Sequence, residues 1–94
     1  MLDIGCGTGE YTQYAAKYAD RAVGIDLSRE MILEASRRAR KTRTKNISFI
    51  EGNALHLNFK DSTFDCVFSY SALQNISEQK LAIAEMKRVL RPGG

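Results

Sequence analysis

Apolar residues along this chain follow two alternating spacings, which predict strands and helices in turn. Four short apolar runs are typical of buried strands, and they lie at 1–4, 22–25, 47–50 and 64–70. Between them, apolar side chains recur at helical spacing over 10–19, after Ser28 and after Ser77, and both serines are candidate N-caps. Strands that alternate with helices predict an α/β domain with a parallel sheet and helices on both of its faces.

The helical spacing also predicts which side chains face the core. On the first helix these are Tyr11, Tyr14, Ala15, Tyr18 and Ala19. On the second helix they are Met31, Ile32, Ala35 and Ala39, and on the last they are Ile83, Met86 and Leu90. Cys66 lies in an apolar run and is expected in the core, whereas Cys6 is expected to be partly accessible.

A glycine loop joins the first predicted strand to the first predicted helix. Gly5, Gly7 and Gly9 stand at alternate positions, where they let the backbone turn sharply and leave room for a ligand above the loop. A dinucleotide fingerprint would need another glycine at position 10, where this chain has Glu10. The carboxylate of Asp3 would repel a pyrophosphate, so the loop favours a cationic ligand.

A second acid and two polar residues follow later strands at the same edge of the predicted sheet. Asp26 ends the second strand, 21 residues after Gly5, which suits an acceptor for two ribose hydroxyls. Asn53 and Ser69 come at or just after the ends of the third and fourth strands. The structural alternatives are a charge at a helix N-terminus for Asp26 and turn residues that bond their own backbone for Asn53 and Ser69.

These motifs together resemble the class I S-adenosylmethionine-dependent methyltransferases, especially the small-molecule type. The resemblance rests on five segments in order and covers essentially the whole chain, at 2–9, 24–28, 51–54, 64–69 and 85–94. It implies a Rossmann-like three-layer sandwich with strand order 3-2-1-4. The family's sheet continues with three more strands, so 1–94 is expected to form a single incomplete domain that lacks much of the substrate site.

The resemblance also implies a role for each residue of the candidate site. Asp3 would face the methionyl amino group, Asp26 would hold the ribose hydroxyls and Leu27 would lie against the adenine. Asn53 and Ala54 would meet the adenine edge, and Ser69 would lie under the methionyl portion. The residues that would line the cofactor are Gly5, Cys6, Gly7 and Gly9. A purely structural turn is the alternative for Asp3 and the glycines.

The methyl acceptor and the catalytic residues are not assigned by the sequence. A small-molecule acceptor is expected, and Tyr70, Ser71 and Gln74 follow the fourth strand, where family members place acceptor-facing groups. His56 is the single histidine and is interpreted as a surface or packing residue. The alternative function is a non-catalytic module that binds S-adenosylmethionine, or a remnant that needs a partner chain.

Charge and composition also bear on binding to nucleic acid, membranes and metal ions. The net charge is +3, and six cations between Arg37 and Lys45 stand without an acid or an aromatic residue among them. We expect them to solvate a helix end, with nucleic-acid binding as the alternative. No apolar run approaches the roughly 20 residues of a membrane span, and the two cysteines form no metal or disulfide pattern. A cytoplasmic protein is expected, with self-association through the exposed fourth strand.

Overall fold

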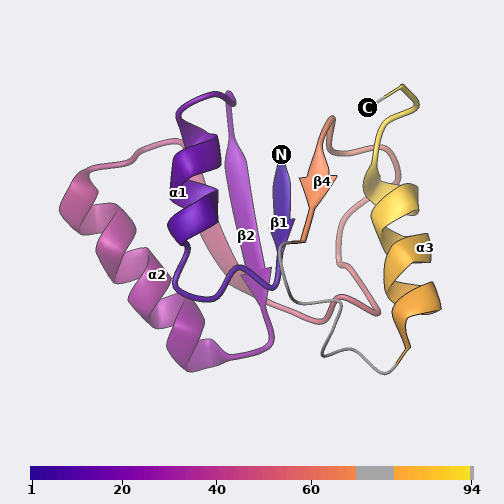
Figure 1. Ribbon diagram of the computed structural model, residues 1–94, viewed down its shortest axis with the longest axis horizontal. Helices are drawn as coiled ribbons and strands as arrows, with labels where there is room; N and C mark the ends of the chain where they lie inside the picture. The colour runs from indigo at the N-terminus through magenta and orange to yellow at the C-terminus, as the bar shows by residue number, and fades with distance from the viewer. Residues whose placement is uncertain (70–77, 94) are drawn as a thin grey trace.

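A computed structural model of the chain describes residues 1–69 and 78–93, and it is an α/β domain (Figure 1). Its parallel strands have the order β3-β2-β1-β4, as predicted. The strands are β1 (Leu2–Ile4), β2 (Ala22–Asp26), β3 (Ile47–Glu51) and β4 (Val67–Phe68). The helices are α1 (Glu10–Ala16), α2 (Arg29–Thr42) and α3 (Gln79–Val89). The sequence therefore predicted the class and the strand order correctly.

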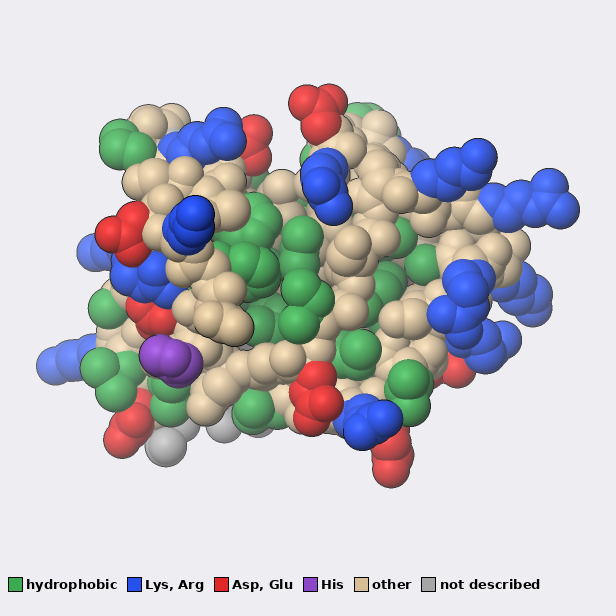
Figure 2. Space-filling view, turned by 180° about the vertical axis from the view of Figure 1, so that it is seen from behind, with side chains coloured by type: hydrophobic (Ala, Val, Ile, Leu, Met, Phe, Trp, Pro, Cys, Tyr) green, Lys and Arg blue, Asp and Glu red, His purple; other side chains and the backbone are tan. Residues whose placement is uncertain are grey.

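The side chains of β1 alternate between the two faces of the sheet, and this alternation places the helices. Leu2 and Ile4 point to one face, where they form the core cluster with Val89 of α3. Asp3 points to the other face, where the hydroxyl of Thr12 on α1 donates a hydrogen bond to it. The helices α1 and α3 thus cover opposite faces. Seen from behind, hydrophobic side chains gather across the middle of the molecule, with Lys and Arg at the margins (Figure 2).

The predicted core face of α1 is wrong. The helix ends at Ala16 and buries Thr12 and Ala16, while the tyrosines lie at the surface. The exposed fractions are 49% for Tyr11, 61% for Tyr14 and 77% for Tyr18. The hydrogen bond between Thr12 and Asp3 fixes the rotation of α1 over the sheet, and the tyrosines line an open hollow together with Val23 and Phe68.

The other two helices match their predicted faces in part. Ile32, Ala35 and Ala39 of α2 are buried as predicted, but Met31 is 42% exposed. On α3, Met86 packs against the core, whereas Ile83 is 40% exposed and its neighbour Ala82 is fully buried. Ser28 caps α2 as expected, because its hydroxyl accepts a hydrogen bond from the backbone N–H of Met31. Leu90 lies just beyond α3, and Ser77 lies outside the described residues.

The fourth strand is shorter than predicted, and the exposure of the two cysteines is the reverse of the prediction. In the described residues β4 covers Val67–Phe68 alone, and Phe64 instead pairs with Leu90 in an isolated bridge. Cys6 is buried against Gly24, whereas Cys66 is exposed. The side chain of Cys66 points to the α1 face at the edge of the sheet, where no described element covers it. Self-association through this edge stays a prediction.

Side chains of α3 and backbone hydrogen bonds from residues 62–64 to its last carbonyls fix the connector between β3 and β4 to this helix. Arg88 donates hydrogen bonds to the backbone carbonyls of Leu57 and Phe59, at 2.7 Å each, and pairs with Asp61 at 2.9 Å. Glu85, one turn earlier, accepts a hydrogen bond from the backbone N–H of Leu57. The connector is therefore ordered without a helix of its own. Within residues 1–69 and 78–93, every helix is too short or too polar to cross a membrane.

We expect the substitution Gly9→Ala to destabilise the fold more than Gly7→Ala. Both glycines have positive φ, 85° and 56°, so both substitutions strain the backbone. A Cβ on Gly9 would lie 2.6 Å from the ring of Phe49, whereas a Cβ on Gly7 would meet nothing within 4 Å. The clash adds about 1 to 3 kcal/mol to the loss of unfolding free energy, measured by urea denaturation. Equal losses would contradict this packing.

Candidate functional site

The glycine loop lies against the carboxyl end of β2. The backbone N–H groups of Gly5 and Cys6 donate hydrogen bonds to the carbonyl of Ile25, at 2.8 and 3.0 Å. One residue further, the N–H of Gly7 donates to a carboxylate oxygen of Asp26 at 2.9 Å. Direct hydrogen bonds consequently hold the loop against Ile25 and Asp26.

Asp26 joins three segments of the chain. Its second carboxylate oxygen accepts a hydrogen bond from the N–H of Ser28 at 2.9 Å, and its carbonyl accepts one from Gly52 beyond β3. The two N–H groups fix the rotamer of this half-buried side chain. A carboxylate has about four acceptor sites, so two remain for the hydroxyls of a ligand.

Asp3 is a buried acid at the end of β1. It is 2% exposed, and Thr12 donates a hydrogen bond of 2.6 Å to its carboxylate. Burial raises the pKa of Asp3 to about 6, while the hydrogen bond from Thr12 lowers this pKa and the negative charge of Asp26 raises it. No cation pairs with Asp3 in the part of the chain that the structure describes. A cationic ligand would therefore stabilise its ionised form.

Cys6 packs in the loop and offers no nucleophile. Burial raises the pKa of its thiol to about 12, and the nearby charges of Asp3 and Asp26 act in the same direction. At neutral pH the thiol stays protonated, and a protonated thiol is a poor nucleophile. Among the described residues, no group of His, Cys, Asp and Glu side chains could hold a metal ion.

A small open hollow lies beside the loop and Asp3. It measures about 200 Å³, and the residues that line it are Asp3, Gly5, Cys6, Gly7, Thr8, Glu10 and Tyr11. The hydroxyl of Ser69 donates to the carbonyl of Ile4 at 2.9 Å, which places Ser69 next to the start of the loop. The structure thus brings together Asp3, the glycine loop, Asp26 and Ser69.

The remaining predicted residues lie at the margin of this arrangement. Leu27 is 69% exposed, beside Asp26. The side-chain oxygen of Asn53 accepts a hydrogen bond from the N–H of Leu55, and Ala54 packs against the core. His56 is exposed, as expected. Tyr70, Ser71 and Gln74 lie outside the described residues.

Thr12 is the site residue that sequence reasoning missed. Its side chain is fully buried and holds the carboxylate of Asp3, nine positions earlier in the chain. The available signal was a hydroxyl residue on the helix that follows a strand with an acidic residue near its end. Tyr11 and Tyr14 on another face of this helix, together with Tyr18 beyond its end, gave a stronger apolar pattern and concealed it.

Residues 2–94 match the family model described as a methyltransferase domain. The chain belongs to this methyltransferase family. It is 34% identical over 97 residues to the demethylmenaquinone methyltransferase of Lactococcus lactis, a match that covers 100% of the chain and 38% of that relative. The chain thus spans about two fifths of the length of the curated relatives it matches.

Solved structures share the fold of this methyltransferase domain. A SAM-dependent methyltransferase from Aquifex aeolicus superposes with a TM-score of 0.90 at 29% identity, over 97% of the chain and 50% of that structure. The [4+2]-cyclase SpnF superposes with a TM-score of 0.91 at 33% identity, over 96% of the chain and 34% of that structure. The Rossmann-like class implied by the five motifs is thereby confirmed.

We expect Thr12→Val to destabilise the fold in a pH-dependent way. The variant removes the donor to a buried carboxylate, which costs about 1 to 3 kcal/mol. Because the pKa of Asp3 is raised on folding, from 3.8 to about 6, this group weakens stability as the pH rises between those values. The loss of unfolding free energy caused by Thr12→Val should therefore be larger at pH 8, where Asp3 is ionised, than at pH 5.

Thermal and urea unfolding at the two pH values measure this loss. Thr63→Val is the matched control, because Thr63 is exposed and its hydroxyl bonds the backbone carbonyl of Lys60. A loss for Thr12→Val that does not change with pH would show that the hydroxyl does not serve the ionised form of Asp3.

Proposed function

We propose that this methyltransferase domain binds S-adenosylmethionine between Asp3, the glycine loop and Asp26, and that it forms part of an enzyme that methylates a small molecule. One observation carries the proposal: a buried carboxylate without a cationic partner among the described residues lines the hollow beside the loop. The desolvation of Asp3 and the charge of Asp26 both favour a ligand that brings a positive charge.

Each end of the proposed site suits a different part of the cofactor. Asp3 would accept from the methionyl amino group, and the free acceptor sites of Asp26 would receive the two ribose hydroxyls. The exposed side chain of Leu27, next in the chain, would cover the adenine. Gly7 has no neighbour where a Cβ would stand, so a ligand can approach its backbone closely.

The contribution of these residues to the reaction is positioning. When bound, the sulfonium cofactor would supply an activated methyl group together with its own leaving group. Asp26 and the loop, fixed to each other by the N–H of Gly7, would hold the sugar, while Asp3 would fix the amino acid end. Orientation of two reactants alone can lower a barrier by several kcal/mol.

The proposed acceptor is a small molecule, and the relatives suggest its kind. Several of them carry the name demethylmenaquinone methyltransferase, at 32% to 36% identity. We therefore propose an aromatic or quinone-like acceptor. No described side chain is assigned as a base, because His56 is exposed on the turn beyond β3.

A second candidate function is cofactor binding without methyl transfer. It is favoured by the similarity to the [4+2]-cyclase SpnF, a protein that shares this fold and is named for a different reaction. Transfer of a labelled methyl group from S-adenosylmethionine to a panel of quinones and phenols separates the two. We expect a labelled product; cofactor binding with no labelled product would support the second candidate instead.

We expect Asp26→Ala to weaken S-adenosylmethionine binding by about tenfold or more, because hydrogen bonds to a charged acceptor are worth about 1.5 to 3 kcal/mol. Isothermal titration calorimetry measures the affinity, and thermal unfolding confirms that the variant folds. Asp20→Ala is the control, since Asp20 is exposed and lies at the other end of α1. Unchanged affinity in the folded Asp26 variant would refute the proposed site.

A further inference from the structure

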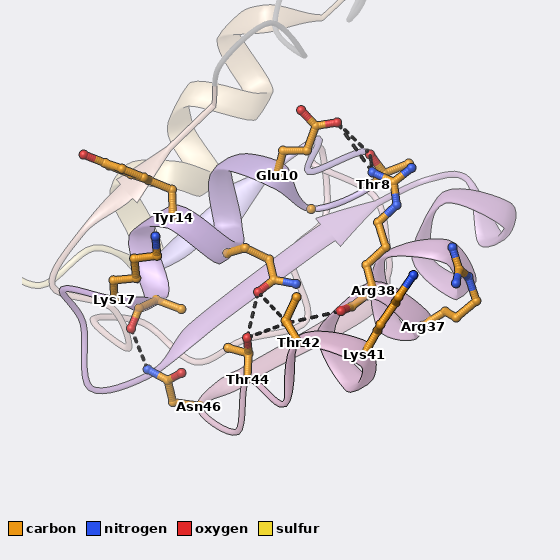
Figure 3. Close-up of a pocket in the computed structure, with 13 residues that line it drawn as sticks. Thr8, Glu10, Tyr14, Lys17, Arg37, Arg38, Lys41, Thr42, Thr44 and Asn46 are labelled. Carbon is orange, nitrogen blue, oxygen red and sulfur yellow. Dashed lines mark hydrogen bonds and ion pairs between the residues drawn. The ribbon is translucent and has the colours of Figure 1, made fainter.

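A groove of about 800 Å³ separates α1 from α2 (Figure 3). It begins beside Thr8 and Glu10 and extends away from the glycine loop to Thr44 and Asn46. Neither Asp3 nor Asp26 lines it. Thr8 and Glu10 line both this groove and the hollow beside the loop, so the groove adjoins the proposed cofactor site and extends away from it.

Basic side chains of α2 and of the residue after α1 line this groove. Lys17 directly follows α1, and Arg37, Arg38 and Lys41 come from α2 (Figure 3). Glu34 accepts hydrogen bonds from Arg37 and Arg38, at 2.7 to 2.8 Å, and so balances part of their charge. Lys17 and Lys41 have no acidic partner within the described ranges.

Further cations continue this charge past the end of α2. Arg40, Arg43 and Lys45 are exposed, and they too lack an acidic partner in the part of the chain that is described. The single acid at the groove mouth is Glu10, which lies 3.6 Å from Arg38. The positive charge is consequently concentrated at the end of the groove that lies away from the glycine loop.

The polar side chains of the groove are held in place. The side-chain oxygen of Gln13 accepts hydrogen bonds from the hydroxyls of Thr42 and Thr44, at 3.2 and 2.8 Å. The amide of Asn46 donates to the carbonyls of Ala16 and Ala19, at 2.8 and 2.9 Å. These bonds tie the end of α2 and the start of β3 to α1. The spacing between α1 and the end of α2 is therefore fixed.

We propose that this groove binds the phosphodiester backbone of a single-stranded nucleic acid. Lys17 after α1 and the cations of α2 line one groove, which suits a chain of phosphates that enters it, whereas a flat lipid surface would reach the outer face of α2 alone. The ring of Tyr14 lies at the rim, turned away from α2, with the Lys17 ammonium 5.8 Å from its centroid. Binding is thus directed at phosphates and is independent of base sequence.

This second site goes beyond the proposed methyl transfer and does not depend on it. The test is fluorescence anisotropy of the full chain with labelled oligouridylate and oligoadenylate of about 20 nucleotides, at several salt concentrations. Similar affinity for both sequences and a linear fall of log affinity with log salt are expected. Each phosphate contact contributes about 0.7 to this slope for single strands.

The decisive variant is the double substitution Lys17→Gln with Lys41→Gln. It removes two phosphate contacts, so the salt slope should fall by about 1.4 and the affinity at low salt should drop. The matched control, Lys80→Gln with Lys87→Gln, changes the net charge equally on α3, at exposed positions that do not line the groove. This control should keep the slope of the parent chain.

Three outcomes would overturn the proposal. They are absence of binding at low salt, equal loss of slope in both double variants, and displacement of the oligonucleotide by vesicles of anionic lipid in a manner that needs the same two lysines. The last outcome would assign the surface to a membrane. Titration of the Lys17 and Lys41 variant with S-adenosylmethionine separates this test from the proposed function, since the cofactor affinity should not change.

Discussion

The hydrogen bond between Thr12 and the buried carboxylate of Asp3 is the interaction on which the arrangement of this domain depends. It sets the rotation of α1 over the sheet and keeps a charge-bearing group at the end of β1 in a site that water barely reaches. A buried acid is costly unless it is hydrogen-bonded or paired. Burial raises the pKa of Asp3 despite the hydrogen bond from Thr12, and a cationic ligand would stabilise the ionised acid.

Asp26 performs the complementary task of joining backbone segments. Its carboxylate receives N–H groups from the glycine loop and from the start of α2, and its carbonyl receives the N–H of Gly52. Three strand ends thereby meet at one edge of the sheet, which is where open α/β sheets bind their ligands. Negative charge is concentrated there, whereas the groove between α1 and α2 is basic, so the two surfaces favour ligands of opposite sign.

The sequence predicted the strand order and the glycine loop because both depend on local patterns. Apolar runs and glycine spacing are visible within a few residues, and β-α-β connections have one hand. The rotation of α1 depends instead on the contact of Thr12 with Asp3, which no local pattern reveals, and the tyrosine face was misjudged for that reason. The exposure of Cys6 and Cys66 was predicted the wrong way round because exposure at the end of a short strand depends on neighbours far along the chain. The exposed tyrosines, Met31 and Ile83 likewise show that helical spacing alone does not determine which side chains are buried.

The contacts of Arg88 determine which parts of this domain unfold together. The connector between β3 and β4 is attached to α3 by the guanidinium of Arg88, by Glu85, and by backbone hydrogen bonds from residues 62–64 to the last carbonyls of the helix. Fraying of α3 would detach residues 57–61 at the same moment, so the helix and the connector form a single cooperative unit of local unfolding. A segment without regular secondary structure thus acquires the exchange protection of a helix.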